Sequence, residues 1–252
     1  MRRVHVAPTV LENRSVSQTI DLDGDRAHYL RDVLRLQPGD AVELFDGQGR
    51  IARTEVVDVG DKVRLRIEVL KSTERGESPL DIVLYQGVPK GKRWEWLMEK
   101  VTELGVTTIV PLETERTVVS IAADRLDHKM ARWNKKLAAA SRQCGRTVIP
   151  DLERPHSLTE AMEQSNCDVH LVAHPIDDAP SAQSALAQLD GEISSVGLWI
   201  GPEGGFSDDE VNNLVDHGAV AIALGPRILR TDTAAIAAVT LVQAAAGDLR
   251  SA

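Results

Sequence analysis

Cysteine is scarce in this chain of 252 residues, which has only Cys144 and Cys167. Two cysteines exclude a disulfide scaffold and a four-cysteine zinc module, and they favour reduced thiols in a cytoplasmic protein. Histidine, cysteine and carboxylate residues form no clustered ligand motif, so no metal is expected. Aromatic residues are as few as 4 Trp, 2 Tyr and 2 Phe, which argues against extensive base stacking.

Long hydrophobic runs are also absent. The most apolar window, 234–246, contains Thr240 and Gln243 and is shorter than the roughly 20 residues that span a bilayer. The basic start, Met1–Pro8, is not followed by an apolar stretch, so neither a signal peptide nor a membrane partner is expected. With 42% hydrophobic and 27% charged residues, the composition is that of a globular protein with one large domain or two modest ones.

Charge is distributed unevenly along the chain. The formal net charge is −9, which by itself argues against nucleic-acid binding. Residues 85–150, however, hold 12 Lys and Arg against 7 Asp and Glu, whereas residues 151–252 hold 4 against 16. Since exposed charges farther apart than about 10 Å are largely screened, the basic middle of an acidic chain can still bind phosphates.

Residues 1–72 are predicted to form a small β-barrel with short strands and frequent turns. The expected strands are 42–45, 51–59 and 62–69. A turn signal at 46–49 separates the first two of them, and one helix is expected at 27–34. The polar segment 73–79 is interpreted as a linker to a second domain, residues 80–252.

Residues 80–252 are predicted to alternate strands with helices. The expected strands are 81–86, 107–111, 168–173, 196–200 and 220–224. Apolar residues at helical spacing predict a helix over 94–104, ended by Gly105, and another over 130–144. This alternation indicates a mostly parallel α/β sheet with helices on both faces, in which ligands bind beyond the carboxyl ends of the strands.

One loop that follows such a strand, Gly201–Phe206, is rich in glycine. Its three glycines let the backbone approach a ligand where a Cβ would collide. Ser207 and Glu210 then form a capping box that begins a helix. The loop has neither the G-x-G-x-x-G spacing nor the lysine of a P-loop, which disfavours a dinucleotide or nucleoside triphosphate. The alternative interpretation is a merely tight strand–helix turn.

A second loop, 224–234, also follows a strand. Ile228 and Leu229 stand there between Arg227 and Arg230, a composition that connections usually avoid. We therefore expect the two apolar residues to line a ligand face. The alternative is that they pack back into the core.

The last predicted helix, 234–246, is apolar nearly all round. Thr231 or Asp232 is expected to cap its N-terminus. A helix of this kind is buried on several sides, either inside its domain or at a subunit interface.

Several ordered segments resemble one known family. Ile200–Phe206 (IGPEGGF) and Leu224–Ala234 (LGPRILRTDTA) look like the two loops that hold S-adenosylmethionine in the RsmE family of ribosomal RNA methyltransferases, which belongs to the SPOUT superfamily. The other similar segments are 28–40 (HYLRDVLRLQPGD), 44–49 (LFDGQG), 86–91 (QGVPKG), 96–105 (WLMEKVTELG), 111–119 (PLETERTVV) and 143–150 (QCGRTVIP). The resemblance spans nearly the whole chain. One departure is Asp232, where the family usually has Glu.

The resemblance implies an α/β protein with a SPOUT trefoil-knot methyltransferase domain over 80–252 and a small PUA-like β-barrel RNA-binding domain over 1–72. It also implies a homodimer that holds S-adenosylmethionine near the subunit interface. The implied reaction is methylation of N3 of a specific uridine in 16S ribosomal RNA, on the assembled 30S particle. That nitrogen carries a proton at neutral pH, so the proton must leave or the developing anion must be stabilised. The base must also be unpaired or flipped out.

The same resemblance guides the assignment of the cofactor pocket. The residues expected to line it are Gly201, Glu203, Gly204, Gly205, Leu224, Gly225, Ile228, Leu229, Arg230, Thr231, Thr233 and Ala234. Arg230 is a candidate for contacting the uridine or its phosphate, and Glu203 or Asp232 for taking the N3 proton. For Arg230 the alternative is a surface ion pair. For the two carboxylates it is a structural place at a helix terminus.

Basic residues at three places are expected to contact RNA. They are His28, Arg31, Arg35, Lys90, Lys92, Arg93, Arg116, Arg132, Lys135, Lys136, Arg142 and Arg146. The first three share one predicted helical stripe at i, i+3 and i+7. For the basic helix 130–144, the alternative is an ordinary solvated face.

Two functions from other classes stay open. The chain could be a non-catalytic RNA-binding assembly factor, against which the intact Gly204, Gly205 and Arg230 argue. It could also be an α/β enzyme for a phosphorylated small molecule, which the missing P-loop lysine disfavours.

Overall fold

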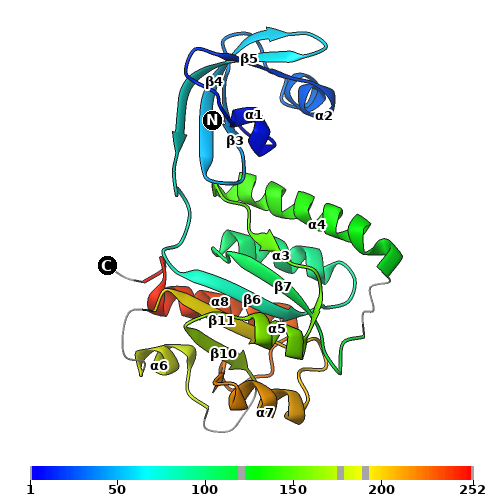
Figure 1. The fold of residues 1–252 in the computed structure, drawn as a ribbon, viewed down its shortest axis with the longest axis vertical. Helices are drawn as coiled ribbons and strands as arrows, with labels where there is room; N and C mark the ends of the chain where they lie inside the picture. Colours follow the sequence, from blue (N-terminus) through cyan, green and yellow to red (C-terminus); the bar gives the residue numbers. More distant parts are fainter. Residues whose placement is uncertain (1, 119–122, 175–178, 189–192, 251–252) are drawn as a thin grey trace. The chain divides into compact units, whose positions relative to one another are not determined.

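The computed structural model describes residues 2–118, 123–174, 179–188 and 193–250. The chain folds into two compact units (Figure 1). Unit 1 comprises Met1–Glu77 and Ser141–Ile149, and unit 2 comprises Ser78–Ala140 and Pro150–Ala252.

The strands are β1 (Arg2–His5), β2 (Thr19–Leu22), β3 (Ala41–Phe45), β4 (Arg50–Val59), β5 (Val63–Ser72), β6 (Asp81–Gly87), β7 (Thr108–Glu113), β8 (Asp151–Leu152), β9 (His156–Ser157), β10 (Val169–Ala173), β11 (Ser195–Ile200) and β12 (Val220–Ile222). The helices are α1 (Pro8–Leu11), α2 (Gly24–His28), the π-helix η1 (Tyr29–Val33), α3 (Arg93–Glu103), α4 (Ala123–Cys144), α5 (Leu158–Gln164), α6 (Ala182–Ala187), α7 (Asp208–Asp216) and α8 (Thr231–Ala246).

Unit 1 is built on a five-stranded sheet in the order β1-β3-β4-β5-β2. β1 pairs in parallel with β3, and the other neighbouring strands are antiparallel. Alternate strand residues point into one hydrophobic core, which Leu11, Ala27 and Leu30 of the helices complete. The expectation of a first domain built from short strands is therefore confirmed. The predicted closed barrel is not seen among the described strands, because the edge strands β1 and β2 do not pair with each other.

The helix expected at 27–34 differs in form from the prediction. α2 ends at His28 and passes directly into the π-helical turn η1, which ends at Val33. Arg35 follows with φ 52°, in the left-handed region. Because a π-turn breaks the 3.6-residue period and Arg35 lies beyond it, the predicted single stripe of His28, Arg31 and Arg35 is wrong.

The segment Ser141–Ile149 packs in unit 1, although the sequence placed it in the second domain. The Arg3 guanidinium donates hydrogen bonds to three carbonyl oxygens of this segment, at 2.9 to 3.3 Å. The Glu77 carboxylate accepts hydrogen bonds from the backbone N–H groups of Thr147 and Val148 at 2.8 and 2.9 Å. Glu77 therefore anchors this distant segment. The interpretation of 73–79 as a linker had not predicted such a contact.

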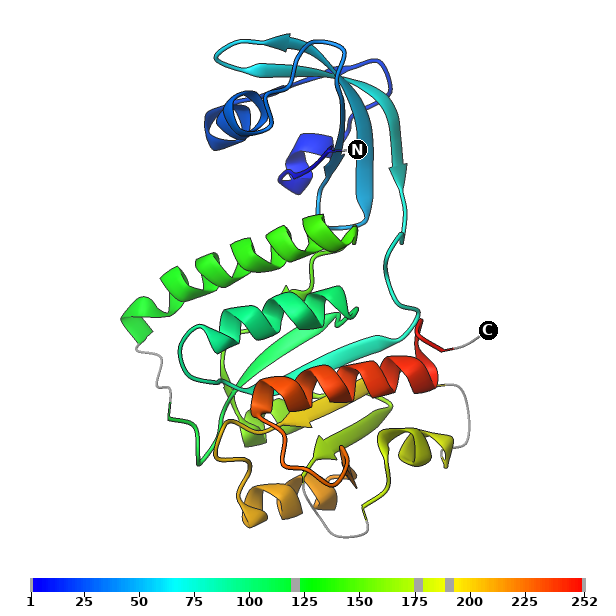
Figure 2. The same cartoon turned by 180° about the vertical axis from the view of Figure 1, so that it is seen from behind.

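Unit 2 contains a parallel sheet in the order β12-β10-β11-β6-β7-β8, with β9 also paired to β7. The five strands expected from the sequence all occur, with ends that differ by at most 2 residues. Side chains from α5 and α7 pack with Tyr85, Val172 and Trp199 on one face of the sheet. α3 and α8 contact each other, and α8 packs on β11 (Figure 2). Across the part of the chain that the structure describes, no helix is long and apolar enough to cross a membrane.

Candidate active site

The two loops singled out in the sequence meet beyond the carboxyl ends of β10, β11 and β12. They border one pocket with a volume of about 600 Å³. Its lining residues are Arg116, Ala173, His174, Ala179, Ile200, Gly201, Pro202, Glu203, Gly204, Gly205, Phe206, Ile222, Ala223, Leu224, Gly225, Pro226, Arg227, Ile228, Leu229, Thr231 and Ala234. Small-molecule sites commonly measure roughly 300–1,000 Å³ and combine apolar walls with a few polar groups, as this pocket does.

Most of the expected cofactor residues line this pocket, and two do not. Arg230 and Thr233 are absent from the lining, which otherwise contains every residue of the predicted set. Arg230 is exposed, and its side chain has no hydrogen-bond or ion-pair partner among the residues that the structure describes. The ion pair considered for Arg230 is therefore not seen within that part of the chain.

Glycine is required in the first loop because the loop folds back on itself. A Cβ on Gly201 would lie 2.8 Å from the carbonyl carbon of Gly205, and Gly205 has φ +69°. Ser207 and Glu210 form the predicted capping box at the start of α7. The tight turn and the pocket wall are thus the same structure.

The second loop is tied to the first at the start of α8. α8 begins at Thr231 with Arg230 as its N-cap, and no side chain caps it, so the expected cap by Thr231 or Asp232 is wrong. The Thr231 hydroxyl donates instead to the carbonyl oxygen of Gly201 at 2.5 Å. Thr231 therefore uses its hydroxyl to join the two loops.

The apolar residues of the second loop lie at the pocket. Ile228 and Leu229 both line it. Ile228 is 92% exposed, so the alternative in which it packs back into the core is wrong. A side chain of this kind is available to a ligand or a partner surface.

The two candidate carboxylates differ in their surroundings. Glu203 lines the pocket, and its Oε1 atom accepts a hydrogen bond from the Lys90 backbone N–H at 2.9 Å. The Arg93 Nη1 atom lies 3.7 Å from the same oxygen. Asp232 accepts a hydrogen bond from the Thr233 N–H at 3.0 Å within the first turn of α8, outside the pocket lining.

Arg116 and His174 line the pocket, although neither was predicted as a pocket residue. Arg116, expected to bind RNA, donates from Nη1 to the carbonyl oxygens of Gly204 and Phe206, each at 3.1 Å. His174 follows β10 directly, and its backbone N–H donates to the carbonyl oxygen of Ile222 at 3.3 Å. Its position after a parallel strand was a signal that could have marked it for the site.

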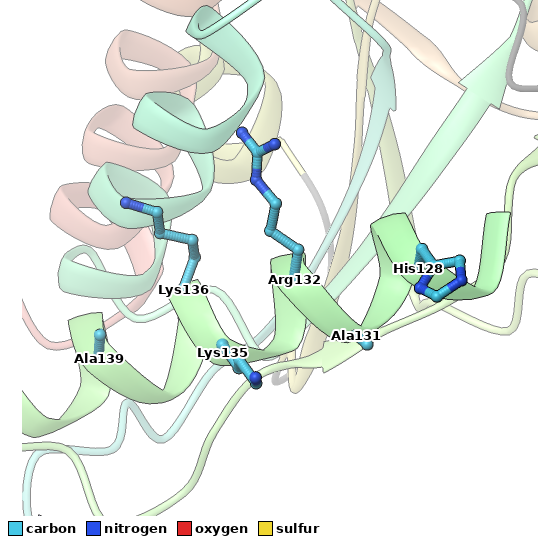
Figure 3. A pocket seen from close by; sticks show the side chains of 6 residues that line it. All are labelled: His128, Ala131, Arg132, Lys135, Lys136 and Ala139. Carbon is cyan, nitrogen blue, oxygen red and sulfur yellow. The ribbon is translucent and has the colours of Figure 1, made fainter. Parts of the chain in front are cut away.

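A face of α4 carries much of the expected RNA-binding charge. A hollow of about 530 Å³ runs along it, lined by His128, Ala131, Arg132, Lys135, Lys136 and Ala139 (Figure 3). Arg132 and Lys136 extend from the same side of the helix (Figure 3). Arg132 pairs with Glu95, while Lys135 and Lys136 are exposed.

Two other basic residues of this region are engaged in unit 1. The Arg142 guanidinium lies over the Tyr29 ring, 5.2 Å from its centroid. Arg146 is 3% exposed and pairs with Glu77 at 2.8 Å. The expectation that Arg146 contacts RNA is therefore wrong, because its guanidinium is buried against a carboxylate.

The remaining basic candidates are exposed, except for Arg31, which is half-buried. His28 and Arg31 both pair with Asp32, at 2.6 and 2.8 Å. Lys90, Lys92 and Arg93 lie just before and at the start of α3. Lys90 and Arg93 contact Glu203, which lines the pocket. In the described part of the chain, no group of three or more His, Cys, Asp or Glu could hold a metal ion.

Comparison with known proteins identifies the family. Residues 76–243 match the model of an RNA methyltransferase domain, and residues 22–70 match that of an RNA methyltransferase PUA domain. Ribosomal RNA small subunit methyltransferase E of Buchnera aphidicola is 31% identical over 241 residues, which cover 95% of this chain and 93% of that protein. This chain belongs to the ribosomal RNA small subunit methyltransferase E (RsmE) family. The RsmE protein of Bacillus subtilis is 30% identical over 229 residues, which cover 89% of each chain.

Solved structures of relatives match both units of this RsmE chain. A methyltransferase from Legionella pneumophila, with S-adenosylmethionine bound, is 35% identical and matches with a TM-score of 0.87 over 98% of each chain. The RsmE protein of Neisseria gonorrhoeae, also bound to S-adenosylmethionine, is 31% identical, with a TM-score of 0.85 over 98% of this chain and 99% of that one. The prediction of an α/β protein with an N-terminal PUA domain and a parallel methyltransferase domain is confirmed.

Proposed function

We propose that this RsmE chain methylates N3 of one uridine in 16S ribosomal RNA, with S-adenosylmethionine as methyl donor and the assembled 30S particle as substrate. The observation that carries the proposal is the pocket that Gly201–Phe206 and Leu224–Ala234 form together. Two relatives that match nearly the whole chain hold S-adenosylmethionine. A ribosomal substrate would place the activity in the cytoplasm.

The pocket residues fit this cofactor in size and chemistry. Ile200, Ile222 and Leu229 offer apolar walls suited to a flat heterocycle. A Cβ on Gly205 or Gly225 would meet nothing within 4 Å, so the backbone at both glycines is open to a ligand. When bound, S-adenosylmethionine supplies a methyl group activated by its positively charged sulfur. The chain must then hold the uridine edge in line with that group, which is mainly a positioning task.

The N3 proton requires an acceptor or a group that stabilises the anion. Of the two carboxylates considered, only Glu203 lines the pocket, so we assign the proton to Glu203 rather than to Asp232. His174 lines the same pocket and is the alternative acceptor. Arg230 stands exposed between Leu229 and Thr231, and we assign it to the uridine or its phosphate.

RNA contact is proposed for the basic face of α4 that lines the hollow in Figure 3. Between His128 and Pro150 the sequence contains no Asp or Glu, whereas the whole chain has a net charge of −9. Exposed lysines and arginines that have no acidic neighbours in the sequence attract the phosphates of RNA. Their binding releases the counterions that had been condensed on the RNA. In the same unit, Lys90, Lys92 and Arg93 are also proposed to contact RNA. His28 and Arg31 are proposed to contact RNA from unit 1.

A homodimer and a trefoil knot are the remaining parts of the proposal. Ile228, Leu241 and Leu249 are exposed apolar residues in and around α8, at 92%, 39% and 51%. A second subunit would bury such residues. Light scattering should therefore give twice the chain mass of 27.5 kDa, and I228E with L241E should give the single mass. The knot is proposed at the two pocket loops, which Thr231 joins to Gly201.

Calorimetric titration of the full chain with S-adenosylmethionine tests the cofactor part of the proposal. We expect saturable binding of one cofactor per chain and competition by S-adenosylhomocysteine. Absence of binding would contradict the proposed function. Binding without methylation of 30S subunits that lack the modification would instead support a non-catalytic assembly factor.

A further inference from the structure

The two pocket loops are joined by a third element, a buried glutamine at the end of β6. Gln86 is wholly buried and lies in a strand that pairs with β11, where Gln86 stands beside Ile200. Its Nε2 atom donates to the Thr231 hydroxyl oxygen at 2.9 Å and to the Gly87 carbonyl oxygen at 2.8 Å. The carbonyl oxygens of Ile200 and Gly201 each lie 3.4 Å from the same nitrogen.

Three of the oxygens around Nε2 belong to different parts of the pocket frame. Thr231 is the first residue of α8, Gly201 begins the first loop, and Gly87 ends β6. Thr231 also donates its own hydroxyl to Gly201, so the chain of hydrogen bonds runs from Gln86 through Thr231 to the first loop. Thr231 and Gly201 line the pocket. The amide therefore connects both cofactor loops at one point.

The carbonyl oxygen of the same amide does not connect the loops. Gln86 Oε1 is buried without a hydrogen-bond partner among the described residues. A buried acceptor left unpaired is unfavourable for folding, so this glutamine is a poor choice for stability alone. An apolar side chain of similar size would avoid that penalty but would not donate to Thr231.

The close approach of backbones at this point adds a second constraint. A Cβ on Gly87 would collide with the Pro202 nitrogen, so β6 and the first loop are in direct contact.

We infer that Gln86 is a positioning residue for cofactor binding: its amide fixes the spacing between the Gly201 loop and the N-terminus of α8. This inference rests on the proposed function, because it concerns the same pocket.

A second buried glutamine provides a matched control. Gln243 is wholly buried near the other end of α8, 12 residues or about 18 Å along the helix from Thr231. Its Nε2 donates to the Leu104 carbonyl oxygen at 2.9 Å, and its Oε1 accepts from Ser78 Oγ at 3.0 Å. Like Gln86, Gln243 makes buried side-chain hydrogen bonds between α8 and another segment of the chain. These bonds lie away from the pocket.

The experiment compares Q86L and Q243L by thermal unfolding and by titration with S-adenosylmethionine, after binding to the unsubstituted chain has been established. We expect the Kd of Q86L to rise about tenfold or more. Without the amide, the two pocket loops would shift relative to each other, and a small shift of the groups that contact the cofactor weakens binding strongly. We expect Q243L to lower the Tm and keep the original Kd. An unchanged Kd in Q86L, or an equal rise in Q243L, would overturn the inference. Failure of the unsubstituted chain to bind would instead count against the proposed function.

Two further variants keep the inference testable if Q86L does not fold. T231V removes the hydroxyl that links Gln86 to Gly201 and should raise the Kd, while T231S should restore it. Q86E places a carboxyl against carbonyl oxygens, where only its protonated form can donate. The Kd of Q86E relative to that of the unsubstituted chain should therefore rise as the pH is raised. A ratio that stays constant with pH, together with an unchanged Kd in T231V, would contradict the inference.

Discussion

Arg116 and Gly204 are packed against each other as well as hydrogen-bonded. The Arg116 guanidinium donates to the Gly204 carbonyl oxygen at 3.1 Å, and a Cβ added to Gly204 would lie 3.0 Å from the Arg116 Cβ. The arginine side chain therefore occupies the space beside the glycine. It supports the loop Gly201–Phe206 at the pocket.

Replacing Gly204 by valine should weaken cofactor binding. The branched side chain would push against Arg116, so the loop must shift and the pocket must change shape. We expect the Kd for S-adenosylmethionine to rise by about tenfold or more while the chain stays folded. G60A is a suitable control, because a Cβ there would meet nothing closer than 3.8 Å. Normal cofactor binding by G204V would refute the placement of the site.

Removing Arg116 should act on the cofactor before it acts on RNA. R116A loses the hydrogen bonds to Gly204 and Phe206, and the first loop loses its support. Calorimetry should show weaker binding of S-adenosylmethionine, with partial recovery in R116K. If R116A bound the cofactor normally and lost only RNA affinity, Arg116 would be an RNA-binding residue, as its charge alone suggests.

Charge reversal on α4 should weaken RNA binding and leave cofactor binding intact. Lys135 and Lys136 are exposed on the face that Figure 3 shows. K135E/K136E should lower the affinity for 30S subunits and reduce the steepness of its salt dependence, by about one unit for each phosphate that the variant no longer binds. R250E lies in the exposed C-terminal segment and changes the charge by the same amount per substituted residue. It should have little effect. An equal decrease in R250E would indicate a general charge effect.

Arg146 should prove to be a stability residue. It is 3% exposed, and its partner Glu77 also holds the backbone of Thr147. Breaking a buried ion pair from one side typically costs about 3–5 kcal/mol, so R146A should unfold at a clearly lower urea concentration. R66A, which removes an exposed pair with Glu55, should cost about 1 kcal/mol or less. Full stability of R146A with impaired RNA binding would contradict this assignment.

Asp168 should make stability depend on acid pH. Hydrogen bonds from the Ser194 side chain and from the backbone of Ser194 and Ser195 lower the pKa of Asp168 to about 2. Because the pKa is lowered in the folded state, the contribution to stability is complete above the ordinary value of 3.8 and is lost as the pH falls through about 2. The Tm of D168N should therefore lie below that of the unsubstituted chain at neutral pH, and the two values should converge near pH 2. A difference that persists there would contradict the assignment.

The sequence predicted most of the parallel sheet because its strands carry strong local signals. Val196–Ile200 is apolar and followed by glycines, and both pocket loops are recognisable by their composition. The capping box at Ser207 is a local pattern and occurs as predicted. Where neighbouring residues decide the structure, the prediction from sequence was sufficient.

Interactions between distant segments explain two of the errors, and a local irregularity of the backbone explains a third. Thr231 was expected to cap a helix, but its hydroxyl bonds Gly201, which lies 30 residues earlier. Arg146 resembles a surface cation in the sequence, but it pairs with Glu77, 69 residues earlier. The stripe of His28, Arg31 and Arg35 failed because a π-turn interrupts the helix. Val119, part of a segment that resembles the family, lies outside the described residues.

The central claim is that this chain transfers a methyl group to N3 of a uridine in small-subunit ribosomal RNA. The most direct measurement is nucleoside mass spectrometry of RNA from 30S subunits that lack the modification, incubated with the chain and methyl-labelled S-adenosylmethionine. We expect labelled 3-methyluridine, at no more than one per subunit, and less of it with G204V when the cofactor is subsaturating. Label on another base or another uridine atom, or no label despite cofactor binding, would contradict it.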